Sequence, residues 1–123
     1  MAIAGSAAFA GQSLLGKKIH FIGIGGSGMS GLARIALADG IEVSGSDSKD
    51  SSVLTALEAL GAKIYRSHSA ENIDGVDVVI YSTAISPTNP EISRAIERSI
   101  PIMTRANALA LLMHGLTSIA VAG

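Results

Sequence analysis

The chain has 123 residues, which suffices for one domain with a buried core. Hydrophobic residues make up 48% of it and aromatic residues only 3%, so we expect an aliphatic core and no aromatic platform on which single-stranded nucleic acid could stack. The net charge of −1 argues against nucleic acid or a membrane as a partner, while the absence of cysteine excludes disulfides and thiol chemistry and makes the cytoplasm the expected compartment.

The first 16 residues are small and apolar but do not have the pattern of a targeting segment. Gly5, Ser6 and Gly11 interrupt the apolar run, and no basic region precedes it. We therefore interpret residues 1–16 as a flexible N-terminal extension.

Apolar runs and helical stripes alternate through the rest of the chain. In chain order, the patterns predict a strand over residues 19–24, a helix with an apolar stripe from Met29 that ends at Gly40, a strand over 41–45, a helix over 53–60 that ends at Gly61, and a strand over 62–65. After a polar stretch over 68–74, they predict a strand over 76–81, a helix capped by Asn89 and Pro90, an edge strand over 100–103, a helix over 109–113 that ends at Gly115, and a strand over 117–122.

This alternation, with short connections, indicates right-handed crossovers between parallel strands. We therefore predict an α/β fold: a Rossmann-like, doubly wound, mainly parallel sheet of about five strands with helices on both faces. The strand over 117–122 is not followed by a covering helix. We interpret the chain as a fragment of a longer protein, the alternative being that Gly123 is a natural end.

A glycine-rich turn separates the first strand from the first helix. Gly23, Gly25 and Gly28 have the spacing G-x-G-x-x-G, which allows a tight turn and a close approach of the backbone to a ligand. The N–H groups at the start of the helix would then face a phosphate, with Ser27 and Ser30 as further donors. The alternative is a turn that packs the helix closely and binds nothing.

Two further segments are expected at the same end of the sheet. Asp47, at the tip of the second strand, is placed to accept hydrogen bonds from a ribose, although it could instead belong to a simple turn. The loop after the fourth strand faces the glycine turn in a doubly wound sheet and offers backbone amides and two hydroxyls for a base or sugar. Its residues are Ser82, Thr83, Ala84 and Ile85, and an ordinary turn is the alternative.

The three histidines are dispersed and have no metal-ligand spacing. His20 lies within the first strand and is expected to be packed and hydrogen-bonded, and His114 precedes a glycine that ends a helix. His68 is in a polar loop near the ligand edge and is the histidine most worth testing. Since we find no catalytic triad or carboxylate pair, we expect a binding module with no metal and no catalytic residue.

The sequence resembles the N-terminal, UDP-sugar-binding domain of the UDP-N-acetylmuramate–L-alanine ligase family of peptidoglycan Mur ligases. The resemblance is carried by Ile19 to Ser30, Ser44 to Asp47, Leu57 to Ala62, His68 with Glu71 and Asn72, Tyr81 to Ile85, Asn89 to Glu91, Arg105 with Ala106, and Ser118 to Gly123. It covers nearly all of the chain after the extension.

The resemblance implies an ATP-dependent ligase that adds L-alanine to UDP-N-acetylmuramic acid. It implies a sugar-nucleotide domain over residues 17–115 and a strand over 116–123 that leads into an ATP-binding domain absent from this chain. The partners would be UDP-N-acetylmuramic acid and, in the full enzyme, L-alanine, ATP and Mg²⁺. The fragment alone would bind no cofactor and be inactive.

The resemblance also assigns positions to the UDP sugar. Gly25, Gly26, Ser27, Gly28, Met29 and Ser30 would hold the diphosphate; Asp47, Ser82, Thr83, Ala84 and Ile85 would hold the uridine; His68 and Arg105 are further candidates. Thr83 stands where the family more often has serine, and it keeps a hydroxyl. Two alternatives stay open: an NAD-binding domain of a dehydrogenase or regulatory module, and the related ligase that recycles murein tripeptide, which usually has a different glycine turn.

Overall fold

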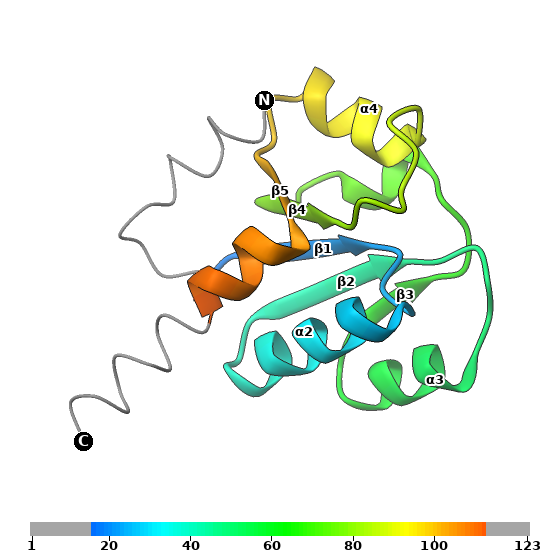
Figure 1. The fold of residues 1–123 in the computed structure, drawn as a ribbon, viewed down its shortest axis with the longest axis vertical. Coiled ribbons are helices and arrows are strands. Elements are labelled where there is room, and N and C mark those ends of the chain that lie inside the picture. The colour runs from blue at the N-terminus through cyan, green and yellow to red at the C-terminus, as the bar shows by residue number, and fades with distance from the viewer. Residues whose placement is uncertain (1–15, 113–123) are drawn as a thin grey trace.

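The computed structural model of the chain describes residues 16–112, and its centre is a five-stranded parallel sheet (Figure 1). The strands are β1 (Lys18–Ile22), β2 (Glu42–Ser46), β3 (Lys63–Tyr65), β4 (Val78–Tyr81) and β5 (Ile102–Thr104). Their order is β3-β2-β1-β4-β5, and each neighbouring pair is parallel. The chain adds β2 and β3 on one side of β1 and then β4 and β5 on the other side, as in doubly wound nucleotide-binding folds. This arrangement confirms the predicted fold class.

Helices cover both faces of the sheet, as predicted (Figure 1). On one face lie α2 (Ser27–Ala38), α3 (Ser52–Ala59) and the helical residues 105–112. On the other lie α4 (Pro90–Glu97) and the 3₁₀ helix η1 (Ala70–Ile73). No helix within residues 16–112 is long and apolar enough to span a bilayer.

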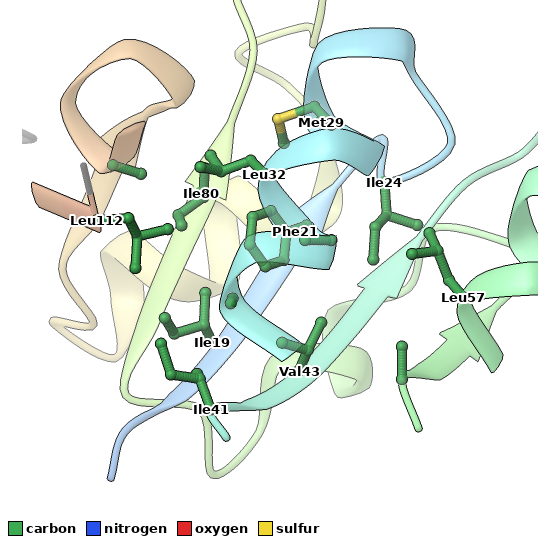
Figure 2. Packing of buried hydrophobic residues seen from close by; sticks show 14 of the residues in the cluster. Ile19, Phe21, Ile24, Met29, Leu32, Ile41, Val43, Leu57, Ile80 and Leu112 are labelled. Atoms are coloured by element: carbon green, nitrogen blue, oxygen red, sulfur yellow. The ribbon is translucent and has the colours of Figure 1, made fainter. Parts of the chain in front are cut away.

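The larger hydrophobic core lies between the sheet and α2 (Figure 2). Ile19 and Phe21 of β1 point into it, and Leu32 of α2 belongs to the same cluster. Because side chains alternate along a strand, the residues between them face α4 instead. Ile22 lies in the smaller core on that side, and His20 is fully buried there.

The strand ends differ from the predicted ones where a turn residue or a short helix intervenes. β1 ends at Ile22 rather than residue 24, because Gly23 takes a φ of +79° and turns the chain. Ile24 then packs against Gly45 of β2, in a space that only glycine leaves free. Part of the predicted polar stretch over 68–74 forms η1. The predicted extension up to residue 15, the strand over 117–122 and His114 lie outside the described residues.

The predicted signals for the start of one helix and the ends of two others are present in the structure. Asn89 caps α4, with its side-chain oxygen accepting the Glu91 N–H at 2.8 Å. Gly40 and Gly61 follow α2 and α3 with φ values of +79° and +111°. These are left-handed conformations that glycine adopts without steric cost, so each helix stops where the sequence indicates.

Candidate functional site

The last residues of the five strands lie side by side in one row across the sheet. In order they are Tyr65, Ser46, Ile22, Tyr81 and Thr104. Each segment predicted to bind a ligand begins within three residues of the end of one of these strands. These segments are the glycine turn, Asp47, His68, Ser82 to Ile85, and Arg105. The structure therefore brings the predicted residues to one edge, at the carboxyl ends of the strands, where doubly wound sheets bind their ligands.

The glycine turn is fastened to β2 by its backbone. The N–H groups of Gly23 and Ile24 both donate to the carbonyl of Ser46, at 2.8 and 3.0 Å. The Gly26 N–H donates back to the Gly23 carbonyl at 3.0 Å, which closes the turn. These three backbone hydrogen bonds hold the turn beside the central strands.

The start of α2 offers free donors at this turn. The first backbone hydrogen bond of the helix runs from the Ser30 N–H to the Gly26 carbonyl at 2.8 Å. Within the described residues, the N–H groups of Ser27, Gly28 and Met29 have no backbone acceptor, and no side chain caps the helix. Such orphan donors attract an anion, helped by the helix dipole.

Two side chains predicted to contact the ligand, those of Met29 and Ser30, make contacts within the protein instead. The Met29 side chain is only 2% exposed and packs in the core (Figure 2), so its backbone alone faces the turn. The Ser30 hydroxyl donates to the Ser27 carbonyl at 3.2 Å. The phosphate-facing groups at this site are therefore chiefly backbone N–H groups.

Asp47 links the glycine turn to its own strand end. One carboxylate oxygen, Oδ2, accepts the Gly25 N–H at 2.9 Å, and the other, Oδ1, accepts the Lys49 N–H at 3.0 Å. A Cβ at Gly25 would lie 2.8 Å from Oδ2, so glycine is needed for this approach. Asp47 therefore forms the turn that the sequence left as the alternative, and it also lies against the second glycine of the motif.

Arg105 lies over the start of α2. A Cβ added to Gly28 would be 3.0 Å from Arg105 Cδ and 3.1 Å from Nε and Nη1. Among the described residues no carboxylate pairs with Arg105, whose side chain is exposed. A guanidinium beside uncapped helix N–H groups forms a second source of positive potential for the same anion.

The loop after β4 lies beside the glycine turn, as expected. Ile85 Cδ1 would be 3.2 Å from a Cβ at Gly23, and the Ile85 N–H donates to the Ser82 carbonyl at 3.0 Å. The Ser82 hydroxyl accepts the Ala84 N–H at 3.3 Å. Thr83 and Ala84 are exposed at the tip of this turn, where they can meet a ligand held on the opposite loop.

A buried carboxylate, Glu91, lies behind this edge and has four hydrogen-bond donors. Oε1 accepts from His20 Nε2 at 2.8 Å and from the Ser46 hydroxyl at 2.6 Å. Oε2 accepts from the Ser69 N–H at 3.1 Å and from Asn72 Nδ2 at 2.8 Å. Burial raises the pKa of Glu91, but the hydrogen bonds from His20, Ser46 and Asn72 outweigh it and hold that pKa below its ordinary value.

The two described histidines both belong to this network. His20 is fully buried between Glu91 and the Ser44 hydroxyl, which is 2.8 Å from its Nδ1, so its predicted packed role is confirmed. His68 Nδ1 is 2.9 Å from the Ser46 hydroxyl. The His68 side chain is 21% exposed, so it connects the buried carboxylate to the surface.

The role of Glu91 was not predicted from the sequence. The available signals were the acidic residue in the first turn of a helix opened by Asn89 and Pro90, and the alternation of polar His20, Ser44 and Ser46 with apolar residues inside buried strands. Polar residues on the covered face of a sheet require a partner from the helix above it.

Comparison with known proteins identifies the family. The model described as Mur ligase family, catalytic domain matches residues 18–117. UDP-N-acetylmuramate–L-alanine ligase of Thermobifida fusca is 50% identical over 106 residues, which are 86% of this chain and 22% of the relative. The chain thus spans about a fifth of the length of the curated relatives it matches.

Solved structures agree with this match. UDP-N-acetylmuramate-alanine ligase from Thermotoga maritima is similar with a TM-score of 0.71 and 41% identity, over 73% of this chain and 21% of that chain. The UDP-N-acetylmuramate:L-alanyl-gamma-D-glutamyl-meso-diaminopimelate ligase from Neisseria meningitides has the same TM-score and 35% identity, over 76% and 30% of the two chains. The resemblance predicted from the glycine turn and its neighbours is therefore confirmed, and the chain belongs to the Mur ligase family.

Proposed function

We propose that residues 17–115 form the UDP-sugar-binding domain of an ATP-dependent UDP-N-acetylmuramate–L-alanine ligase, and that residues 116–123 lead into its ATP-binding domain. Relatives with that name at about 50% identity support this assignment over an NAD-binding module. The enzyme would act in the cytoplasm on UDP-N-acetylmuramic acid, L-alanine and ATP, with neither nucleic acid nor a membrane as a partner.

The observation that carries the proposal is the uncapped start of α2 with Arg105 packed beside it. The diphosphate would accept hydrogen bonds from the N–H groups of Ser27 and Gly28, and the Arg105 guanidinium would neutralise part of its charge. Asp47 and the loop over 82–85 would hold the uridine, and His68 would contribute from the β3 side of the same edge.

The chemistry of the ligation belongs to other parts of the full enzyme. Within residues 16–112 no group of three acidic or histidine side chains could hold a metal ion, so the described residues do not fit a site for Mg²⁺. We therefore propose that ATP and Mg²⁺ bind outside this part, and that this domain contributes by holding and orienting the sugar nucleotide. Glycine residues and backbone donors suit that task, since they bind without adding reactive groups.

The proposal predicts ligand-specific shifts in an amide NMR titration of the ¹⁵N-labelled chain. UDP-N-acetylmuramic acid is expected to shift the amides of residues 25–30, 47 and 82–85, and NAD is expected to leave them unchanged. Replacing Gly28 by alanine should weaken the response about tenfold or more, because the added methyl group pushes Arg105 off the helix start and a charged hydrogen bond is worth about 1.5–3 kcal/mol.

Gly31 provides the matched control on the same helix. A Cβ there meets nothing within 4 Å, so Gly31→Ala should leave the dissociation constant within about twofold and raise stability by roughly 0.5–1 kcal/mol. Shifts with NAD alone would overturn the proposed function. Equal binding by the two alanine variants would overturn the placement of the diphosphate.

Replacing Asp47 by alanine is expected to weaken the binding of UDP-N-acetylmuramic acid about tenfold or more, through the loss of a charged acceptor for the ribose. Asp77→Ala is a suitable control, because Asp77 Oδ2 accepts the Lys18 N–H at 2.7 Å at the opposite edge of the sheet. That variant loses the same kind of backbone contact without touching the site. Isothermal titration should show a weakened affinity only for Asp47→Ala, and an unchanged dissociation constant would contradict the role of Asp47.

A further inference from the structure

A continuous path of hydrogen bonds leads from the buried Glu91 to the surface at His68. It runs from the Glu91 carboxylate to the Ser46 hydroxyl at 2.6 Å, and from that hydroxyl to His68 Nδ1 at 2.9 Å. Glu91 itself is fully buried, and its helix α4 covers the opposite side of the sheet from α2. None of the ligand contacts proposed above uses Glu91, yet four hydrogen-bond donors converge on its carboxylate, which indicates a role for this buried charge within the chain itself.

Those four donors make an ionised carboxylate the group that fits. Each oxygen of Glu91 accepts two hydrogen bonds, and a neutral amide in its place would turn an NH₂ group toward two donors. The lowered pKa of Glu91 agrees with this arrangement. Glu91 therefore has no proton to donate to its neighbours at neutral pH.

The direction of the hydrogen bonds follows from the single proton of the Ser46 hydroxyl. That proton is donated to Glu91 Oε1, so Ser46 Oγ can only accept at its other contact. The partner there is His68 Nδ1, which must then carry a proton itself. Glu91 Oε2 also lies 3.8 Å from His68 Nδ1, which further favours a proton on that nitrogen.

The second ring nitrogen of His68 reaches the surface. Among the described residues His68 Nε2 has no hydrogen-bond partner. Because every buried side-chain nitrogen or oxygen there does have a partner, Nε2 is not buried. We propose that Glu91 is a positioning residue that acts through the Ser46 hydroxyl to keep neutral His68 protonated at Nδ1, so that Nε2 is a hydrogen-bond acceptor at the ligand edge.

This assignment indicates which ligand groups His68 recognises. An unprotonated Nε2 accepts from an O–H or N–H group and offers nothing to a carbonyl or phosphate oxygen. This step rests on the proposed function, in which the ligand is a uridine nucleotide. The donor would then be a ribose hydroxyl or the imide N–H of uracil. Ser46 directly precedes Asp47, so two acceptors would then face the nucleoside from neighbouring positions.

The tautomer is measured directly by long-range ¹H–¹⁵N correlation spectra of the imidazole rings. At about pH 8, above the usual titration range of histidine, the full chain without ligand should show His68 protonated at Nδ1. Ser46→Ala removes the acceptor and should move the proton toward Nε2. Ser44→Ala is the matched control, since it deletes a hydroxyl two residues away on β2 that contacts His20 and not His68.

A His68 protonated at Nε2 in the unaltered chain, or an unchanged tautomer in Ser46→Ala, would overturn the proposal. A second measurement uses UDP as the probe. Ser46→Ala should weaken its binding about threefold to tenfold, the value of one hydrogen bond, and Ser44→Ala should leave it within about twofold. Equal affinities of the two variants would also count against the proposal.

The source of the donor is distinguished by two analogues of UDP. If the ribose is the donor, 2′-deoxy-UDP should bind the unaltered chain and Ser46→Ala equally; if the base is the donor, N3-methyl-UDP should do so. Failure of the unaltered chain to bind UDP would refute the proposed function, while the ligand-free spectra would still decide the role of Glu91. The two ideas therefore fail separately.

Discussion

Replacing Gly45 by alanine is expected to lower the free energy of unfolding by about 2–3 kcal/mol. A Cβ at this buried position would lie 2.4 Å from Ile24 Cδ1 and 2.6 Å from Ile24 Cβ. The second of these atoms is attached to the backbone, so a rotamer change of Ile24 cannot relieve the clash. The strand cannot retreat either, because β2 is paired on both sides, with β1 and β3.

Urea unfolding followed by circular dichroism measures this loss. Gly31→Ala, the same chemical change in open space, serves as the control and should be more stable than the unaltered chain by roughly 0.5–1 kcal/mol. Since Ile24 belongs to the glycine turn, Gly45→Ala should also weaken the UDP sugar response in the amide titration. A Gly45→Ala variant as stable as Gly31→Ala would show that the packing of Ile24 on β2 is not tight.

Replacing Glu91 by glutamine is expected to destabilise the chain by about 2–4 kcal/mol at neutral pH, because an uncharged amide on this buried side chain cannot accept from all four donors. The pKa of Glu91 in the folded chain is below its ordinary value of 4.5. Its stabilising contribution is therefore fully present above that value and is lost as the pH falls through the folded-state pKa. The difference between the unaltered chain and the variant should shrink on acidification.

Unfolding curves at about pH 7 and in steps below pH 5 test this dependence. Glu97→Gln is the control, since Glu97 is on the same helix but is 71% exposed and pairs with Arg94 at 3.5 Å. An exposed pair of this kind contributes less than about 1 kcal/mol, so this variant should differ little from the unaltered chain at any pH. A difference for Glu91→Gln that grows toward acid pH would contradict the assignment of a buried, ionised carboxylate.

The fold could be predicted because its signals are local. Each strand is a short apolar run that ends at a turn residue, and each helix shows an apolar stripe and a stop, such as Gly40 after α2. The errors occur where contacts between segments that are distant in the sequence decide the structure. Ile24 looks like a strand residue, but the positive φ of Gly23 turns the chain, and Ile24 packs across the sheet onto Gly45.

The site could be predicted only as far as the backbone provides it. The glycine spacing and the strand tips indicated where the turn, Asp47 and the loop over 82–85 would meet. The Met29 side chain, by contrast, belongs to both the motif and the apolar stripe, and the structure places it in the core. Glu91 was not predicted because its partners His20, Ser46 and Asn72 are 71, 45 and 19 residues away in the sequence.

The position of β1 in the middle of the sheet has a consequence for the chain as it leaves the ribosome. Of the five described strands β1 is made first, and one of its edges can pair with β2 once residue 46 has been synthesised. Its other edge pairs with β4, which is complete only at residue 81. During that interval an apolar strand, Lys18–Ile22, exposes unpaired N–H and C=O groups, which is the condition under which nascent chains associate with one another.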